Sequence, residues 1–384
     1  MNSPRPAPEP IPFNRVWVPE GALALLEQSL RSGQWSGDQG FTARCRQWLE
    51  RQLGVSNVLL TTSCTHALEL AALLLRIGPG EEVILPSFTF VSTANAFVLR
   101  GATPVFADVR PDTLNLDERQ LEALVTPRTR AIVPVHYNGV ACDLDAIAAV
   151  AERVGASVIE DNAHGLFGAY HGRLLGTRGR LGAVSFHESK MYTCGEGGAL
   201  LVNDPALAER AEILREKGTD RTRFFRGQTA QYTWLDVGSS YLPADPLAAL
   251  LWSQFEQRAT LQSRREALWQ RYHAGLETWA RAQGVRQPVC PPGCVQPYYM
   301  YFLLLPTRET RDRFLRELKG AGIQSTFHYL PLHLSPMGRA CARPQPACPV
   351  TEQVSGQIAR LPLFPDLTPA DQDRVLEAVT RFVC

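Results

Sequence analysis

The chain has 384 residues, roughly 2.6 times a 150-residue domain, so one two-lobed protein or two domains are expected. Hydrophobic residues make up 45% and charged residues 20%, which is typical of a folded globular protein and argues against extensive disorder. The 39 lysines and arginines nearly balance the 38 aspartates and glutamates. The resulting net charge of +1 argues against a general nucleic-acid-binding protein, which needs a basic excess.

Cysteine usage and hydropathy indicate the compartment. Nine cysteines occur at irregular spacings without a CxxC pair, which argues against a zinc site or a disulfide framework. No run of 18 apolar residues is present, and prolines interrupt the N-terminus where a signal peptide needs its apolar core. We therefore expect free thiols, no metal, no membrane contact and a cytoplasmic location.

Through about residue 240, short β-branched runs alternate with helical stretches. The predicted strands are 57–62, 81–86, 104–109, 131–136, 157–161, 183–187 and 198–203. The predicted helices lie between them at 65–78, 89–101 and 143–154, with a further helix opening at 204. This alternation predicts an α/β fold around a largely parallel sheet.

The pattern changes after residue 240. A long helix is predicted over about 243–282, followed by a strand at 298–305, a helix at 308–322, a short strand at 324–329 and two terminal helices. We predict a flexible leader at 1–10, a large α/β domain at 11–242 and a smaller α+β domain at 243–384, which is entered through the long helix.

One lysine and one carboxylate carry the main chemical hypothesis. The chain has neither GxGxxG nor GxxxxGK[ST], so a dinucleotide or P-loop enzyme is not indicated. Asp161 ends one apolar strand and Lys190 follows another, in glycine-rich surroundings. Alone, Asp161 reads equally well as a helix cap, and a lone lysine such as Lys190 is usually a solvated surface residue. Together they match pyridoxal phosphate, which needs a lysine for an imine link and a carboxylate for its ring nitrogen.

Other residues match further parts of this cofactor, each with an ordinary structural alternative. Cys64 and Thr65 open a helix whose N–H groups suit a phosphate, and Ser185 precedes Lys190 by five positions. A plain helix cap is the alternative. Phe90 suits ring stacking or a core position. His164 suits a hydrogen bond to the ring's phenolic oxygen or a structural role.

Five segments together resemble the nucleotide-sugar aminotransferase family (the DegT/StrS group): SCTHAL, PSFTFVSTANA, IEDNAH, SFHESKMYTCGEGG and HYLPLH. The resemblance extends from Ile11 to Phe382. Further stretches, such as GDQGFTARCRQWLE and YTWLDVGSSYL, most resemble the transaminases that form dTDP-4-amino-4,6-dideoxygalactose. The resemblance implies the α/β architecture of pyridoxal-phosphate fold type I, pyridoxamine phosphate as the intermediate cofactor form, and a homodimer with shared active sites.

The resemblance also implies residue roles. Lys190 is the imine-forming, catalytic lysine, and Asp161 is the partner of the ring nitrogen. The remaining contacts to the cofactor fall on Cys64, Thr65, Phe90, His164 and Ser185, and a sugar contact falls on His328.

Three positions depart from the common family pattern. Cys64 replaces a glycine and Met191 replaces an asparagine. Ser240 stands where many members have an asparagine that reaches the cofactor phosphate of the neighbouring subunit. We interpret this serine as characteristic of the subgroup and assign Ser240 to the same cofactor contact. His187 is expected on the same strand face as Ser185. It either contacts the substrate or has a role outside the site.

The implied reaction moves an amino group from L-glutamate to C4 of dTDP-4-keto-6-deoxy-D-glucose. Its product, dTDP-4-amino-4,6-dideoxy-D-galactose, would serve a surface polysaccharide such as enterobacterial common antigen or an O-antigen. Arg223 and Arg226 read equally well as a diphosphate-binding pair and as a surface loop.

Several alternatives remain: the gluco epimer, another nucleotide-linked 4-keto-6-deoxyhexose, a dehydratase of the same fold, or a non-catalytic sensor. Such dehydratases carry histidine in place of the lysine. Lys190 and Asp161 together favour the transaminase.

Overall fold

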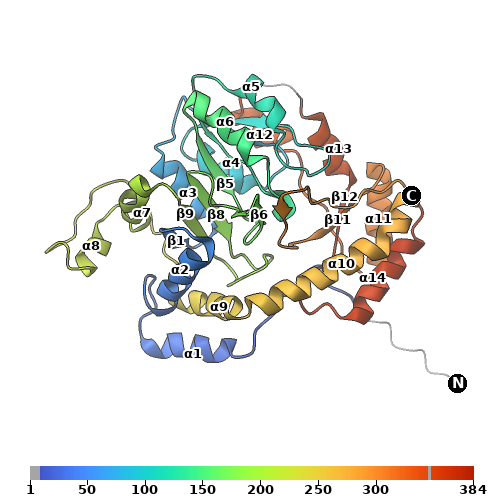
Figure 1. The fold of residues 1–384 in the computed structure, drawn as a ribbon, viewed down its shortest axis with the longest axis horizontal. Helices are drawn as coiled ribbons and strands as arrows, with labels where there is room; N and C mark the ends of the chain where they lie inside the picture. Colours follow the sequence, from blue (N-terminus) through green and yellow to red (C-terminus); the bar gives the residue numbers. More distant parts are fainter. Residues whose placement is uncertain (1–8, 345–346) are drawn as a thin grey trace.

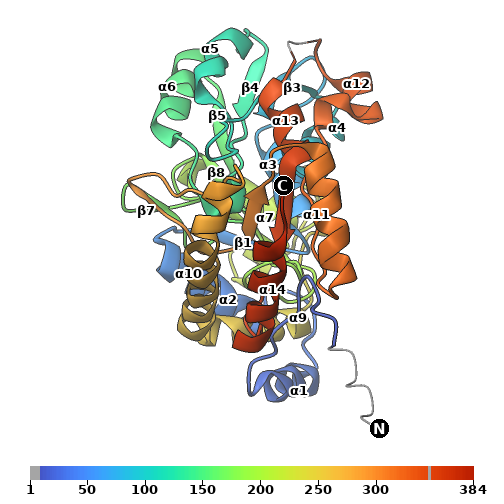
Figure 2. The same ribbon diagram turned by 90° about the vertical axis from the view of Figure 1, so that its right-hand side faces the viewer.

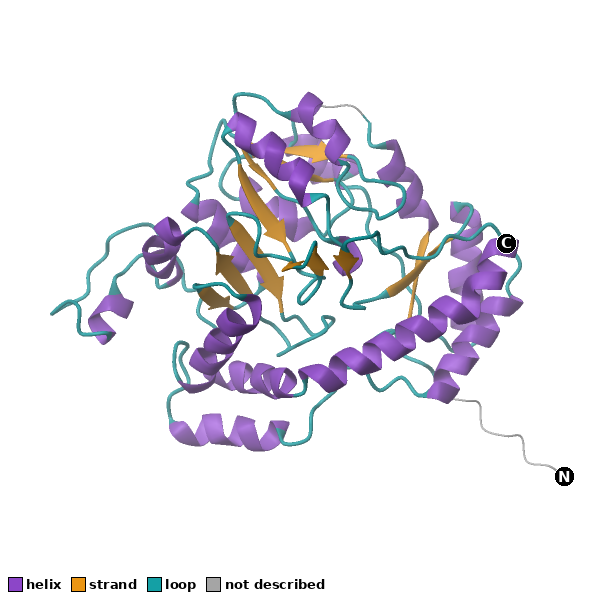
Figure 3. Ribbon diagram, viewed as in Figure 1, coloured by secondary structure: helices purple, strands orange, loops and turns teal. Residues whose placement is uncertain are grey.

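The computed structural model describes residues 9–344 and 347–384. A seven-stranded sheet lies at its centre, in the order β1-β9-β8-β5-β4-β2-β3 (Figure 1; Figure 3). Its strands are β1 (Val58–Thr61), β2 (Glu82–Pro86), β3 (Thr103–Ala107), β4 (Thr129–Ile132), β5 (Ser157–Asp161), β8 (Leu181–Ser185) and β9 (Gly198–Val202). All neighbours pair in parallel except β9, which is antiparallel to β1 and β8. The predicted α/β class is confirmed.

Helices cover both faces of this sheet, so its strands are apolar on both sides. Along β1, Leu59 packs into a core with α3 (Cys64–Leu74), α4 (Val91–Val98) and α7 (Ala208–Arg215). Its neighbours Val58 and Leu60 face the opposite core, which includes α2 (Gly40–Leu53) and α9 (Asp245–Glu256). Helices α5 (Leu121–Leu124) and α6 (Leu144–Val154) pack against the β2, β3 and β4 end of the sheet.

The prediction of one long helix at 243–282 is wrong, because the chain forms two helices there. Helix α9 ends at Glu256, and α10 (Arg258–Ala282) begins after Gln257, whose φ of −101° and ψ of 19° leave the helical region. The two helices have different partners: α9 packs on α1 (Ala22–Ser32) and α2, whereas α10 packs on α14 (Pro369–Arg381). Figure 2 shows α14 beside α10.

The chain after α10 surrounds a second, two-stranded sheet of β11 (Tyr301–Leu304) and β12 (Ile358–Leu361). A separate apolar core joins this sheet to α10, α11 (Arg308–Gly320) and α14. The strand predicted at 324–329 is reduced to one bridge between Thr326 and Arg360. The division at residue 242 stays a prediction, and the first eight residues of the predicted leader lie outside the described residues.

The remaining elements are short. They are β6 (Ala169–Tyr170), β7 (Arg173–Leu174), β10 (Cys294–Val295), α8 (Arg221–Phe225), α12 (Pro336–Cys341) and α13 (Pro349–Gln357). Among the described helices, none has the length and apolar character needed to cross a bilayer.

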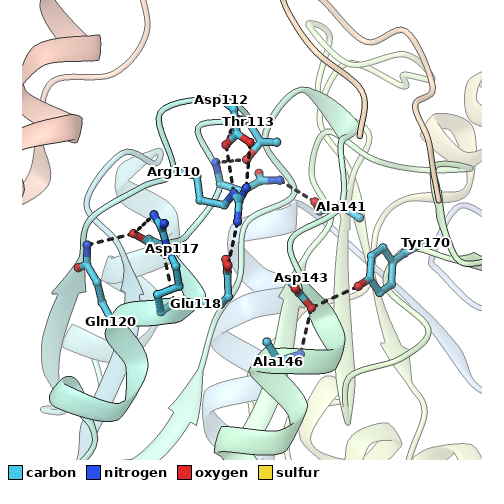
Figure 4. A network of polar contacts seen from close by, with 12 residues as sticks. Arg110, Asp112, Thr113, Asp117, Glu118, Gln120, Ala141, Asp143, Ala146 and Tyr170 are labelled. Carbon is cyan, nitrogen blue, oxygen red and sulfur yellow. Dashed lines mark hydrogen bonds and ion pairs between the residues drawn. The ribbon is translucent and has the colours of Figure 1, made fainter. Parts of the chain in front are cut away.

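A polar network fixes the loop after β3 against the start of α6 (Figure 4). Within the loop, Arg110 donates to Glu118 at 2.8 Å, and the Asn115 amide donates to the backbone carbonyl of Ala141, just before α6, at 2.8 Å. Asp143 caps α6 by accepting from a backbone N–H at 3.0 Å. In the same loop, the side-chain oxygen of Asn115 accepts from the backbone N–H of Tyr137 at 2.9 Å. The network thereby sets the position of Tyr137, whose hydroxyl reaches the candidate site.

Candidate active site

Lys190 and Asp161 are brought to the same edge of the sheet. Asp161 is the last residue of β5, and Lys190 follows the neighbouring parallel strand β8. The carboxylate is buried, at 4% exposure. Burial raises the pKa of Asp161, whereas a hydrogen bond from Thr93 and the positive charge of Lys190 act in the opposite direction. The two predicted residues therefore share one electrostatic environment.

Two hydrogen bonds orient the Asp161 carboxylate. The Thr93 hydroxyl, on α4, donates to Oδ2 at 2.7 Å, and the backbone N–H of Ala163 donates to Oδ1 at 3.2 Å. The sequence analysis missed Thr93. Its only signal was its place inside the segment PSFTFVSTANA, where nothing distinguishes it from an ordinary helix residue.

Tyr299 contacts Lys190 directly and was also missed. Lys190 Nζ donates to the Tyr299 hydroxyl at 3.3 Å, and the Tyr299 ring stacks on His164 with centroids 4.6 Å apart. Burial alone would raise the pKa of Tyr299, but the charges of Lys190 and Arg360 outweigh it and bring that pKa to about 8. A phenol with a lowered pKa therefore lies at the reactive end of the lysine.

His328 lies in the same cluster. Its Nε2 accepts a hydrogen bond from Arg360, so its Nδ1 carries the proton and donates to the Tyr137 hydroxyl at 3.0 Å. Burial, followed by the charges of Arg360 and Lys190, lowers the pKa of His328 well below its ordinary value. His328 is therefore neutral. Burial likewise lowers the pKa of His164, which lies 3.3 Å from the Tyr329 hydroxyl through Nε2.

The residues predicted for the phosphate gather at the start of α3. This helix begins at Cys64 after Ser63, whose hydroxyl accepts from a first-turn N–H at 3.1 Å. Gly198 of β9 pairs with Ser185 and lies so close that a Cβ there would be 2.4 Å from the Cys64 nitrogen. Thr65 Oγ1 is 2.7 Å from the hydroxyl oxygen of Ser92. Cys64, Thr65 and Ser185 thus surround one helix N-terminus.

Phe90 and His187 lie at the margin of this cluster. Phe90 precedes α4, is 57% exposed, and its ring centroid is 6.3 Å from that of Tyr329. His187 makes contacts to Ser189 at 2.9 Å and to Glu196 at 3.6 Å. The backbone N–H of Lys190 donates to the carbonyl oxygen of His187 at 2.9 Å, but no hydrogen bond between their side chains is found in the described part of the chain.

Arg223, Arg226 and Ser240 lie elsewhere on this chain. Arg223 and Arg226 belong to the α8 region and form ion pairs with two glutamates of α7 at 2.9 Å and 2.7 Å. Arg226 and Ser240 line a cavity of about 560 Å³ together with Trp35. Neither Lys190 nor Asp161 lines that cavity. Within one chain, these three residues are therefore not part of the Lys190 cluster.

A largely parallel sheet with a lysine and a carboxylate at one edge defines the site of a pyridoxal-phosphate enzyme of fold type I. Residues 19–380 match the model of the DegT/DnrJ/EryC1/StrS aminotransferase family. The chain belongs to this family, and it is a pyridoxal-phosphate-dependent transaminase.

Solved structures of similar proteins agree. TlmJ, an aminotransferase from Streptoalloteichus hindustanus, is 33% identical, with a TM-score of 0.89 over 97% of this chain and 98% of that one. CalS13, a sugar aminotransferase from Micromonospora echinospora, is 26% identical, with a TM-score of 0.87 over 97% and 99%. Spr1654 from Streptococcus pneumoniae, 25% identical with a TM-score of 0.89 over 97% and 98%, has been solved with pyridoxal phosphate and with pyridoxamine phosphate.

The residues of the site fit this cofactor. Nδ1 of His164 is buried and has no hydrogen-bond partner among the described residues, so it is available to the ring's phenolic oxygen. The first-turn N–H groups of α3 have no acceptor within their own helix and suit a phosphate. Burial raises the pKa of the Cys64 thiol well above its ordinary value, so a neutral thiol stands beside them. No cluster of three metal-ligating side chains occurs in residues 9–344 and 347–384.

Proposed function

We propose that the enzyme transfers an amino group from L-glutamate to C4 of dTDP-4-keto-6-deoxy-D-glucose. The product would be dTDP-4-amino-4,6-dideoxy-D-galactose, destined for a surface polysaccharide such as enterobacterial common antigen or an O-antigen. The observation that carries the amino transfer is Lys190, hydrogen-bonded to Tyr299 beside the buried carboxylate of Asp161. A sugar as acceptor is supported by the likeness to CalS13, and the particular sugar by the sequence segments quoted above.

Residues of both strands and helices would hold the cofactor. Lys190 would bind it covalently, Asp161 would pair with its ring nitrogen, and the N-terminus of α3 with Ser185 would bind its phosphate. Phe90 would stack on the ring from the start of α4. When bound, pyridoxal phosphate supplies an electron sink that makes the donor's α-proton acidic.

Lys190 then acts as the general base and acid. Nζ takes the proton from the α-carbon of the donor and would return it to the cofactor carbon on the other side of the transferred nitrogen, and it reverses these transfers on the keto sugar. The Tyr299 hydroxyl, 3.3 Å from Nζ, orients that amine between transfers. Asp161 must stay ionised to hold a positive ring nitrogen, and the hydrogen bonds from Thr93 and Ala163 favour its charged form.

We further propose that two copies of the chain complete each active site. Arg226 and Ser240 line a cavity that does not include their own Lys190, and we assign them to the phosphate groups bound by a neighbouring chain. Residues 221–237 also expose several large apolar side chains, among them Phe225, Trp234 and Val237. An exposed apolar patch of this kind is typical of a protein interface. We assign Arg223 and His187 to substrate contacts in the same assembly.

A cytoplasmic location completes the proposal. All nine cysteines are unpaired, and several, such as Cys45 and Cys142, are fully buried. Free thiols in these numbers suit a reducing compartment.

The decisive experiment follows the two half-reactions by colour. The purified protein with pyridoxal phosphate should be yellow, L-glutamate should bleach it, and dTDP-4-keto-6-deoxyglucose should restore the colour. NMR of the amino sugar then distinguishes galacto from gluco configuration at C4. Lys190→Ala should give a folded protein without turnover, and full activity in that variant would overturn the mechanism. A yellow wild type that ignores amino acids would indicate a sensor.

A further inference from the structure

Arg360, in β12, is a buried cation whose charge has no carboxylate partner in the described part of the chain. The residue is 8% exposed, and no described aspartate or glutamate oxygen lies within 4.0 Å of its guanidinium nitrogens. Its Nε is buried without a hydrogen-bond partner among those residues. Because an unpaired charge is costly to bury, free donors of this kind indicate an anionic ligand.

Other buried arginines of the chain are accounted for differently. Arg215 pairs with Asp38, and Arg311 donates to a neighbouring carboxylate at 2.7 Å and to backbone carbonyls. Arg265 also lacks a carboxylate partner among the described residues and leaves Nε without a hydrogen bond, but it donates to the backbone carbonyl of Tyr299 at 3.2 Å, and burial lowers its pKa to about 10. The one hydrogen bond found for the Arg360 guanidinium in the described residues goes to a histidine nitrogen, which carries no negative charge.

Two contacts fix the Arg360 side chain next to His328. Its guanidinium carbon lies 4.6 Å from the centre of the Phe13 ring, and Nη1 donates to Nε2 of His328. The positive charges of Lys190 and Arg360 both lower the pKa of Tyr299, which is hydrogen-bonded to Lys190. Lys190 follows β8 of the central sheet and Arg360 lies in β12 of the two-stranded sheet, so residues far apart in the sequence act on the same tyrosine.

We propose that Arg360 binds the α-carboxylate of the amino donor, an inference that rests on the proposed function. In an amino acid, the carboxylate is one bond from the carbon whose proton Lys190 removes. In a nucleotide sugar, the diphosphate is attached at C1, across the ring from the reacting C4. Arg360 and Lys190 both act on Tyr299, so Arg360 is placed to bind the anion that lies closer to the reacting carbon, which is the α-carboxylate of the amino acid. Its Nε and Nη2 make no hydrogen bond with the described residues and suit the two oxygens of a carboxylate.

Arg360→Gln should damage the donor half-reaction selectively. We expect kcat/KM for bleaching by L-glutamate to fall about 100-fold, the usual scale for losing one partner of a buried charge pair. The Kd of 2-methylglutamate, which keeps both carboxylates but has no α-proton, should rise by a similar factor in a spectral titration without turnover. Reaction of the pyridoxamine form with the keto sugar should change less than about 3-fold.

Two variants control for folding and for charge. Arg264→Gln makes the same change at a surface arginine of the C-terminal segment, and it should leave both half-reactions intact. Arg360→Lys keeps the charge without the fork of donors and should recover part of the donor affinity. Circular dichroism and the absorbance of bound cofactor report whether each variant is folded and loaded.

The outcomes distinguish a failure of the inference about Arg360 from a failure of the proposed function. If L-glutamate bleaches the wild type and Arg360→Gln equally well, the inference fails and the proposed function stands. If only the keto-sugar half-reaction suffers, Arg360 binds the diphosphate and the inference is overturned. If glutamate does not bleach the wild type, the proposed function fails and this inference fails with it.

Discussion

At the residue scale, the contact between Lys190 and Tyr299 couples two acid–base groups. An ordinary tyrosine titrates near pH 10 and would remain a neutral hydroxyl through the physiological range. Here burial opposes ionisation, but the charges of Lys190 and Arg360 are stronger and bring the pKa of Tyr299 to about 8. The phenol can therefore release its proton close to the pH at which the enzyme works, next to the amine that must gain and lose one.

Tyr299→Phe tests this coupling in the cofactor-free protein. An ultraviolet difference titration of the wild type against the variant should show one tyrosinate forming near pH 8. Because the folded-state pKa lies below that of the unfolded chain, the ionised group stabilises the fold above about pH 10, and this contribution is lost as the pH falls through 8. The wild type should gain up to about 3 kcal/mol over the variant between those values. A difference that stays flat with pH would contradict the coupling.

The same scale shows what sequence reasoning can and cannot find. Lys190 and Asp161 could be predicted because each lies at the end of an apolar strand, where the local pattern alone gives its place. Tyr299 could not, because it lies in an apolar run that is predicted as an ordinary core strand, and Arg360 could not, because no strand is predicted where β12 forms. Their roles depend on which way a side chain points after two distant segments have packed together, and no local spacing encodes that direction.

At the element scale, β9 links the two halves of the cofactor-binding region. It is the one antiparallel strand of the described central sheet, and its first residue, Gly198, pairs with Thr61 on one side and Ser185 on the other. The absence of a side chain at Gly198 lets the start of α3 approach the strand closely. Any Cβ there would collide with backbone atoms of Ser63 and Cys64, which cannot move without displacing the helix.

Gly198→Ala should therefore both destabilise the fold and weaken cofactor binding. We expect the free energy of unfolding to fall by about 2–3 kcal/mol, as measured by urea denaturation, with a raised Kd for pyridoxal phosphate. Gly320→Ala is a matched control, because a Cβ at this helical position meets no atom within 4 Å. That control should be neutral or stabilising by up to about 1 kcal/mol. Equal effects at both glycines would argue against the close approach.

Periodicity predicted the elements of the sheet better than those that follow it. The helix at 143–154 corresponds closely to α6, since Asp143 caps it and Gly155 ends it in a left-handed conformation. The break at Gln257 was missed because the apolar spacing continues across it, and only the change of packing partner separates α9 from α10. Sequence spacing reports which residues are apolar but not which neighbour they contact.

At the scale of the whole molecule, the α8 region projects away from the C-terminal helices (Figure 1). Trp234 in the following loop is 77% exposed, although a large apolar side chain gains most from burial. The proposed dimer would cover this surface and bring Arg226 and Ser240 to the neighbouring site. Arrangement in two chains could be inferred from the family resemblance, whereas composition and spacing carry no signal for it.

Trp234→Ser should convert a dimer into monomers at micromolar concentration, as measured by size-exclusion chromatography with light scattering. Removing one large apolar side chain from an interface costs about 2–4 kcal/mol of association free energy. Turnover should fall in parallel, because each site would lose contacts from the second chain. Val383→Ser, at an apolar position near the C-terminus that is 65% exposed, should leave both properties unchanged. A dimer that survives the tryptophan change would place the interface elsewhere.

The break at Gln257 also divides the active site by origin. Lys190, Asp161 and the start of α3 precede it, whereas Tyr299, His328 and Arg360 all follow it. The groups that hold the cofactor and the arginine that we propose binds the amino donor are thus encoded in separate stretches of the gene. Mutations in the later stretch can redirect such an enzyme to a new amine donor or sugar while its core chemistry is inherited intact.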